Sequence, residues 1–155
     1  MEENYNKNLI IVISSPSGAG KTTVCKELIA RNNNICLSIS DTTRQARDNE
    51  SNGIDYNFIE ESEFKERIKK NSYIEYARVF GNYYGSQRKN IIDCFKKNKD
   101  ALFDIDWQGA EQLKKSSLSN IISIFITPPS KEVIYHRLKL RAKSSGDDED
   151  AIDKR

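Results

Sequence analysis

Residues 9–22 have the sequence LIIVISSPSGAGKT, and this stretch decides the fold. Its first five residues, 9–13, are a continuous aliphatic run without polar alternation, which is typical of a strand buried on both faces of a parallel sheet. Small residues and glycines occupy positions 14–20, and residues 21–31 carry apolar side chains near helical spacing. The stretch therefore predicts a strand, a glycine-rich loop and a helix, in that order.

The loop matches the phosphate-binding pattern GxxxxGK[ST] (P-loop), with Ser15 in place of the first glycine. Gly18 and Gly20 allow the backbone to turn its N–H groups towards phosphate oxygens, and the start of the helix adds partial positive charge. In such loops the lysine contacts the β and γ phosphates and the hydroxyl residue contacts Mg²⁺. By itself the loop predicts only that a nucleoside triphosphate binds, as in kinases, ATPases, GTPases and sulfotransferase-like proteins.

The rest of the chain alternates between expected strands and expected helices. We expect strands at residues 35–40, 55–59, 72–80, 101–106 and 121–127. We expect helices at residues 61–70, 86–97, 109–115 and 130–141. This alternation favours an α/β fold in which helices flank a right-handed, parallel sheet.

The organisation predicted from these elements is one domain with two appendages. Its core comprises residues 8–40 and 87–136, and the small elements of residues 41–86 form an inserted, mixed α/β subdomain. Residues 137–155 form a lid, in which the serine-, glycine- and acid-rich stretch 143–150 predicts a mobile loop before a last helix. A length of 155 residues suits one compact domain.

Composition and charge exclude several classes of protein. A net charge of +2 is far from the strongly basic balance of proteins that bind nucleic acid polymers. The N-terminus has no apolar run long enough for a signal peptide or a membrane span, so we expect a cytoplasmic protein with no membrane partner. The three cysteines form no metal-binding or CxxC pattern, which indicates free thiols in a reducing compartment. Apolar residues make up only 37%, as expected for an open polar cleft or for missing packing surface.

A second motif occupies residues 42–59, with the sequence TTRQARDNESNGIDYNFI. Arg44 and Arg47, three residues apart in an extended loop, can bind one phosphate group through paired hydrogen bonds. The hydroxyls of Tyr56 and Tyr84 can each donate a hydrogen bond to the same phosphate group. These residues predict a site for the phosphate of an acceptor.

The chain resembles the guanylate kinase family, of the bacterial type. The resemblance rests on residues 42–59 together with four further groups in the family's order, namely Ile74 to Tyr76, Gly81 to Ser86, Asp104 to Gly109, and Arg137 with Arg141. It covers nearly the whole chain. Members of the family usually continue for several tens of residues beyond the position of Arg155, so we expect a C-terminally shortened chain or part of a longer one.

The resemblance implies that ATP binds the loop and GMP binds the insert. The expected ATP contacts are Ser15, Pro16, Ser17, Gly18, Ala19, Gly20, Lys21, Thr22 and Thr23. The expected GMP contacts are Ser40, Arg44, Arg47, Tyr56, Glu75, Tyr84, Ser86 and Asp106. Guanine presents N1–H and a 2-amino group side by side, which one carboxylate, Glu75, can accept together, while Ser40 or Ser86 donates to O6. Adenine would leave these polar groups unpaired.

Asp104 and Asp106 follow a buried strand, where carboxylates face the cleft of an open α/β sheet. One is expected to order the magnesium shell and the other to act on the acceptor side. We assign Thr22 and Asp104 to Mg²⁺, and the resemblance places Asp106 near the guanine. The residues alone leave this division of roles open.

The lid carries two arginines four residues apart, Arg137 and Arg141, hence on one helical face. By resemblance they join Lys21 and Arg44 as catalytic residues that stabilise charge on the transferred phosphoryl group. Arg155 matches a third lid arginine of the family. We interpret His136 as a residue of the helix surface and Trp107 as a packing residue.

The implied activity is the Mg²⁺-dependent transfer of a phosphoryl group from ATP to GMP, and to dGMP, in purine nucleotide metabolism and GMP recycling. One alternative is a non-catalytic, guanylate-kinase-like module that binds phosphopeptides, although such modules typically lack the intact loop found here. Another nucleotide kinase or an ATPase is a further alternative. We expect a monomer or a homodimer.

Overall fold

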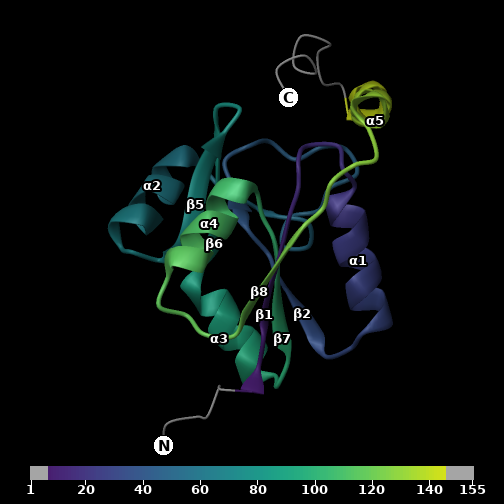
Figure 1. Cartoon of the computed structure of the whole chain (residues 1–155). Coiled ribbons are helices and arrows are strands. Elements are labelled where there is room, and N and C mark those ends of the chain that lie inside the picture. Colours follow the sequence, from purple (N-terminus) through teal and green to yellow (C-terminus); the bar gives the residue numbers. More distant parts are fainter. Residues whose placement is uncertain (1–6, 146–155) are drawn as a thin grey trace, which may run out of the picture.

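The computed structural model of the chain describes residues 7–145, which form both strands and helices (Figure 1). The elements, in chain order, are β1 (Ile10–Ser14), α1 (Lys21–Arg31), β2 (Ile35–Ser38), β3 (Asp41–Thr42), β4 (Asn57–Phe58), α2 (Glu61–Lys69), β5 (Tyr73–Val79), β6 (Asn82–Gln87), α3 (Arg88–Lys96), β7 (Asp100–Asp104), α4 (Trp107–Lys115), β8 (Ile121–Phe125) and α5 (Lys131–Ser145).

The main sheet has four strands in the order β2-β7-β1-β8, and every pair in it is parallel. The aliphatic run of residues 10–13 forms its central strand β1, as the lack of polar alternation predicts. Ile13 of β1 lies beside Asp104 at the end of β7. The predicted α/β fold with a parallel sheet is therefore confirmed, and its strand ends bring the loop after β1 next to the acidic end of β7.

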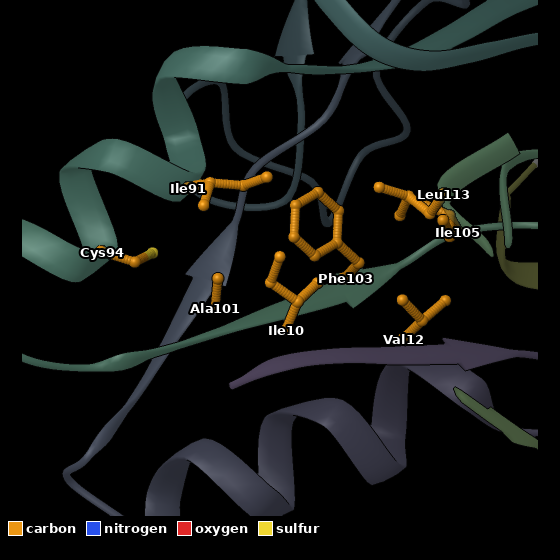
Figure 2. Packing of buried hydrophobic residues seen from close by; sticks show 8 residues of the cluster. All are labelled: Ile10, Val12, Ile91, Cys94, Ala101, Phe103, Ile105 and Leu113. Carbon is orange, nitrogen blue, oxygen red and sulfur yellow. The ribbon is translucent and has the colours of Figure 1, made fainter. Parts of the chain in front are cut away.

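The core lies on both faces of this sheet because successive residues of a strand point to opposite sides. On one face, Ile10, Val12 and Phe103 pack against Ile91 of α3 and Leu113 of α4 (Figure 2). On the other face, a second cluster joins the sheet to α1 through four buried residues: Ile13, Cys25, Ile35 and Leu102. The helix that follows the glycine-rich loop is thus fixed to the sheet by its own buried side.

A second, smaller sheet has the order β4-β3-β6-β5 and comes entirely from residues 41–87. Its β3 pairs in parallel with β4 and antiparallel with β6, and β5 pairs antiparallel with β6. A shift of register between Tyr73 and Glu75 sets Glu75 opposite Ser86. This mixed sheet, with α2, is the part of the molecule that we propose as the inserted subdomain.

A buried carboxylate, Asp41, holds the second sheet together. Asp41 is fully buried and accepts hydrogen bonds from Asn57, from the hydroxyl of Tyr73 and from the side-chain amide of Gln87. Arg67 of α2 forms an ion pair with it. One side chain therefore links strands β3, β4, β5 and β6 with a helix, and all of its partners are polar, as a buried charge requires.

Several predicted boundaries were wrong. The helix expected from residue 86 begins at Arg88, because residues 82–87 form β6. The two-residue turn between β5 and β6 has left-handed backbone at Phe80 and Gly81, which matches the twist of a hairpin. The strand expected at 55–59 shrinks to Asn57–Phe58, and α4 begins at Trp107 rather than residue 109.

The helix α5 runs to Ser145, so residues 143–145 are helical where a loop was predicted. The remainder of that predicted loop, the last predicted helix and Arg155 lie outside the described residues. Within residues 7–145, no helix combines the length and the apolar character that a membrane span needs.

Candidate active site

A cleft of about 860 Å³ separates the carboxyl ends of the main sheet from the second sheet. All the predicted site residues line it except Ser86 and Arg141. Ser86 is buried just behind it, and the side chain of Arg141 lies outside the part of the chain that the structure describes. The donor residues 15–23 form one wall, which we call the donor wall. The acceptor residues Arg44, Arg47, Tyr56, Glu75 and Tyr84 form the other, the acceptor wall.

The donor wall is the loop between β1 and α1. Gly18 and Gly20 have φ angles of 82° and 95°, which side chains rarely tolerate. No side chain caps α1 at Gly20, so the first backbone N–H groups of the helix remain available to an anion. The loop therefore has a backbone that can face an anion, and its binding of phosphate oxygens stays a prediction.

Lys21 and Thr22 both contact the end of β7. The Nζ atom of Lys21 lies 2.9 Å from an oxygen of Asp104 and donates to the backbone oxygen of Ile105 at 2.8 Å. The Thr22 hydroxyl donates to the other Asp104 oxygen at 2.9 Å. A hydroxyl and a carboxylate beside a phosphate-binding loop are oxygen donors of the kind that Mg²⁺ takes, so these residues fit a magnesium ion bound with a triphosphate.

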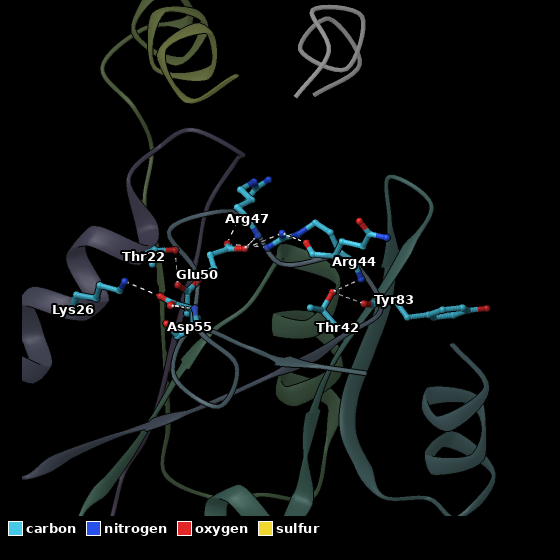
Figure 3. A network of polar contacts seen from close by, with 11 residues as sticks. Thr22, Lys26, Thr42, Arg44, Arg47, Glu50, Asp55 and Tyr83 are labelled. Carbon is cyan, nitrogen blue, oxygen red and sulfur yellow. Dashed lines mark hydrogen bonds and ion pairs between the residues drawn. The ribbon is translucent and has the colours of Figure 1, made fainter. Parts of the chain in front are cut away.

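The acceptor wall holds its two arginines around a carboxylate, Glu50 (Figure 3). Both terminal nitrogens of Arg44 donate to Glu50 at 2.9 Å, and Glu50 also accepts from the backbone N–H and the guanidinium of Arg47. Burial opposes charge on Arg44, but its bonds to Glu50 outweigh this and raise the pKa of Arg44. Burial also opposes charge on Glu50, which by itself would raise its pKa. The hydrogen bonds and charges of the two arginines outweigh this and bring the pKa of Glu50 below its ordinary value. The protein thus contains a planar, bidentate anion contact at the predicted phosphate site.

Two tyrosines stand beside this arginine pair. The rings of Tyr56 and Tyr84 meet edge to face with centroids 6.0 Å apart, and the Arg44 guanidinium lies 5.5 Å from the Tyr56 centroid. Burial, followed by the nearby charge of Asp104, raises the pKa of Tyr56. Tyr56 therefore keeps its proton and can donate a hydrogen bond to an acceptor phosphate.

The predicted guanine contacts gather around Glu75. Its side chain is buried, and Oε1 has no hydrogen-bond partner among the described residues. Burial raises the pKa of Glu75 to about 7, although Ser86 offsets part of the rise and Asp106 adds to it. The hydroxyls of Ser40 and Ser86 lie 2.9 Å apart. A buried carboxylate oxygen without a donor is a strong signal for a ligand that brings one.

Asp106 lies at the start of α4 and already has protein partners. One of its oxygens caps the helix by accepting from the backbone N–H of Gly109 at 2.9 Å, and the other accepts from Gln108 at 3.1 Å. Asp106 also lines the cleft, as does its neighbour Trp107. Trp107 is 61% exposed, so the interpretation of Trp107 as a packing residue was wrong.

The helix α5 covers the donor loop. Arg137 donates to the backbone oxygen of Ala19 at 3.0 Å, and Leu138 is buried against Gly18. Arg141 lies one helical turn further along α5. One predicted lid arginine therefore reaches the phosphate-binding loop. His136 is exposed, as predicted for a surface residue.

Glu50 and an ion pair between α1 and the loop before Tyr56 were not predicted from the sequence. The Nζ atom of Lys26 in α1 lies 2.8 Å from a carboxylate oxygen of Asp55. Glu50 and Asp55 both lie in the motif of residues 42–59, and a carboxylate within an arginine-containing loop is the signal that could have identified Glu50.

The parallel sheet, the loop and the lysine define an α/β protein of the phosphate-binding-loop class. The family model described as guanylate kinase matches residues 7–154, which is nearly the whole chain. The chain belongs to the guanylate kinase family.

Individual relatives agree with this assignment. Guanylate kinase from Rickettsia bellii (strain RML369-C) is 46% identical over 147 residues, which are 95% of this chain and 75% of that protein. Guanylate kinase from Clostridium tetani (strain Massachusetts / E88) is 49% identical over 132 residues, covering 85% and 62% respectively. Among solved structures, a guanylate kinase from Anaplasma phagocytophilum matches with a TM-score of 0.73 and 43% identity. That match covers 84% of this chain and 65% of the other.

Proposed function

We propose that this protein transfers the γ-phosphoryl group of ATP to GMP, giving ADP and GDP. The observation that carries the proposal is the pairing of the two walls. A phosphate-binding loop with Lys21 lies across one cleft from a pair of arginines and a buried carboxylate that has an unpaired oxygen. A donor phosphate and an acceptor nucleotide can then occupy the same cleft.

The donor wall binds and orients ATP. The backbone N–H groups of the loop and the start of α1 bind phosphate oxygens, and Lys21 neutralises charge on the β and γ phosphates. Thr22 and Asp104 would hold Mg²⁺, which supplies further positive charge to the phosphates when it is bound. Asp104 pairs with Lys21 and Thr22 and keeps both side chains at the end of β7.

The acceptor wall binds GMP at both the phosphate and the guanine. Arg44 and Arg47 bind the phosphate in the place where they now contact Glu50, with Tyr56 and Tyr84 as hydroxyl donors. Glu75 accepts N1–H and the 2-amino group of guanine, Ser40 or Ser86 donates to O6, and Asp106 lies on the same side. An ionised Glu75 is required, because only the carboxylate accepts from both donors.

Transfer itself needs positioning and charge rather than a strong base. A phosphate oxygen of GMP attacks the γ phosphorus, the bond from that phosphorus to the β–γ bridging oxygen breaks, and ADP leaves. Arg137, which already contacts the donor loop, and Arg141 stabilise the charge on the transferred group, and closure of the cleft excludes water. The insert of residues 41–86 and the lid from residue 137 are the parts that we propose to move.

A coupled assay of ADP production tests the proposal. Purified protein with ATP and Mg²⁺ is given GMP, dGMP, AMP, UMP or no acceptor in parallel. We expect turnover with GMP and dGMP at least about 100 times faster than with the other nucleotides, since mismatched polar groups are strongly rejected. Equal rates with no acceptor would indicate an ATPase, and a preference for AMP or UMP would indicate a different nucleotide kinase.

The alternative of a phosphopeptide-binding module finds less support, because Gly18, Gly20, Lys21 and Thr22 all stand in a formed loop. Tight phosphopeptide binding without any nucleotide turnover would favour it. The cytoplasmic location and the monomeric or homodimeric state stay predictions from the sequence.

A further inference from the structure

The carboxylate of Glu75 rests against the helix α4 at Gly109. A Cβ atom added at Gly109 would overlap Glu75 Oε2 and would lie 2.9 Å from its Cδ, closer than real Cβ contacts allow. The Gly109 backbone N–H is meanwhile held by Asp106, which caps the helix. The Glu75 carboxylate can therefore occupy this position only because residue 109 is a glycine.

The residue next to Glu75 is held by the same helix. The side-chain amide of Gln112 accepts from the backbone N–H of Tyr76 at 3.2 Å and donates to the Tyr76 backbone oxygen at 2.8 Å. Because β5 is an edge strand of the second sheet, these backbone groups lack a strand partner, and the amide takes the place of one. Gln112 thereby fixes the position of β5 along α4 at the point where Glu75 is carried.

The helix that makes both contacts is itself anchored in the core. Leu113 is fully buried and packs against Val12 and Phe103 of the main sheet. The helix starts directly after β7, whose end holds Asp104, the partner of Lys21. Position and orientation of the guanine-binding carboxylate are thus set by the core helix as well as by the second sheet.

We infer that Gly109 and Gln112 are positioning residues that determine guanine specificity, Gly109 by leaving room for the Glu75 carboxylate and Gln112 by fixing the strand that carries it. This inference rests on the proposed function, in which Glu75 accepts the guanine edge. Neither residue needs to touch GMP.

The test compares Gly109→Ala, Gln112→Ala and the control Glu111→Ala, an exposed residue on the same helix. Steady-state constants are measured with GMP, with inosine monophosphate, which lacks the 2-amino group, and with ATP. Each substitution is also made in a Glu75→Ala background, so that coupling can be read from a double-mutant cycle. Alanine is a better helix former than glycine, so helix propensity alone would not make Gly109→Ala harmful.

We expect Gly109→Ala to raise the KM for GMP by about 10- to 100-fold, the usual effect of losing hydrogen bonds to a charged group, and Gln112→Ala by about 3- to 10-fold. The preference for GMP over inosine monophosphate should fall in parallel. The KM for ATP and kcat should stay within about threefold, and Glu111→Ala should resemble the wild type. With Glu75→Ala present, neither substitution should have a further effect on the KM for GMP beyond about twofold.

Effects that add fully in the Glu75→Ala background, or that change the ATP and GMP constants alike, would overturn the inference, because they would show a general structural role. So would an unchanged GMP preference in both variants. If Gly109→Ala does not fold, Gln112→Ala decides alone. Failure of the proposed function gives a different result, because the wild-type protein would then not phosphorylate GMP at all.

Discussion

The two walls of the cleft are built in different ways. The donor wall is one continuous stretch, residues 15–23, between a buried strand and a helix, and the phosphate contacts that we propose for it are largely backbone N–H groups. The acceptor wall takes its side chains from a loop and two strands of the second sheet, between Arg44 and Tyr84. It already contains an anion of its own, Glu50, in contact with both arginines.

This difference shows two solutions to binding a phosphate group. A backbone cradle needs a local turn and a helix start, and its charge is a partial one that needs no neutralising partner. A pair of guanidinium groups repel one another and need a carboxylate nearby when no phosphate is bound. We therefore expect that replacing one side chain is enough to abolish the action of the donor wall. In the acceptor wall, we expect the effect of a substitution to depend on the residues that contact the replaced side chain.

Lys21→Ala should give the largest effect on the donor wall. Lys21 is the charged side chain of the loop itself, so kcat should fall by at least about 1,000-fold, while GMP binding stays nearly intact. Steady-state kinetics measures kcat, and calorimetric titration with GMP measures GMP binding. Lys115→Ala, an exposed lysine on α4, is the matched control. Turnover equal to that of the wild type would end the kinase proposal.

Asp41→Ala tests the support of the acceptor wall. Its removal leaves Arg67, Tyr73 and Gln87 without their shared acceptor, so the free energy of unfolding should fall by about 3 kcal/mol. Urea denaturation measures this. In folded protein, the KM for GMP should rise more than the KM for ATP. A loss of less than about 1 kcal/mol would show that Asp41 is not the anchor of the second sheet.

Arg44→Ala should raise the KM for GMP by about 10- to 100-fold, because it removes a bidentate partner and leaves Glu50 facing the incoming phosphate. Adding Glu50→Gln to this variant should recover part of the loss, since it removes the uncompensated carboxylate. The same kinetic assay tests both. If the second substitution makes binding worse, Glu50 acts by holding Arg47 rather than by repelling phosphate.

The smallest expected effect concerns pH. The pKa of Glu75 is raised to about 7, so its ionised fraction falls as the pH drops through neutrality, and the GMP-binding form is lost on the acid side. The KM for GMP should rise about tenfold from pH 8 to pH 6, which follows from titration of one group. The acceptor phosphate titrates near pH 6 as well, so Glu75→Gln serves as the reference. That variant should discriminate poorly against other nucleotides and show a smaller dependence on pH. Equal pH profiles for both proteins would contradict the assignment of Glu75.

The sequence predicts the donor wall more completely than the acceptor wall for a physical reason. The loop, its glycines and Lys21 are consecutive, so their pattern alone contains the geometry. The partnership of Lys21 with Asp104 follows from the register of parallel strands, which the alternation of elements indicates.

The acceptor wall depends on contacts between residues far apart in the sequence. The last two residues of β6, Ser86 and Gln87, were predicted to start a helix, and pairing with β5 makes them part of a strand. Packing between elements also determines three features that the sequence does not indicate. They are the register shift before Glu75, the partners of Asp41, and the space at Gly109 that the Glu75 carboxylate occupies. Trp107 illustrates the same limit, because its apolar character predicts packing but it lies at the exposed start of α4, where it lines the cleft.

A buried cysteine, Cys25, can be used to measure local opening of the folded protein. Cys25 on α1 is 1% exposed, and burial, followed by the charge of Asp104, raises the pKa of its thiol to about 12. Such a thiol is almost wholly unreactive towards alkylating reagents while α1 lies on the sheet. The rate at which Cys25 is alkylated therefore measures how often the helix behind the phosphate-binding loop lifts away, and bound nucleotide should slow it.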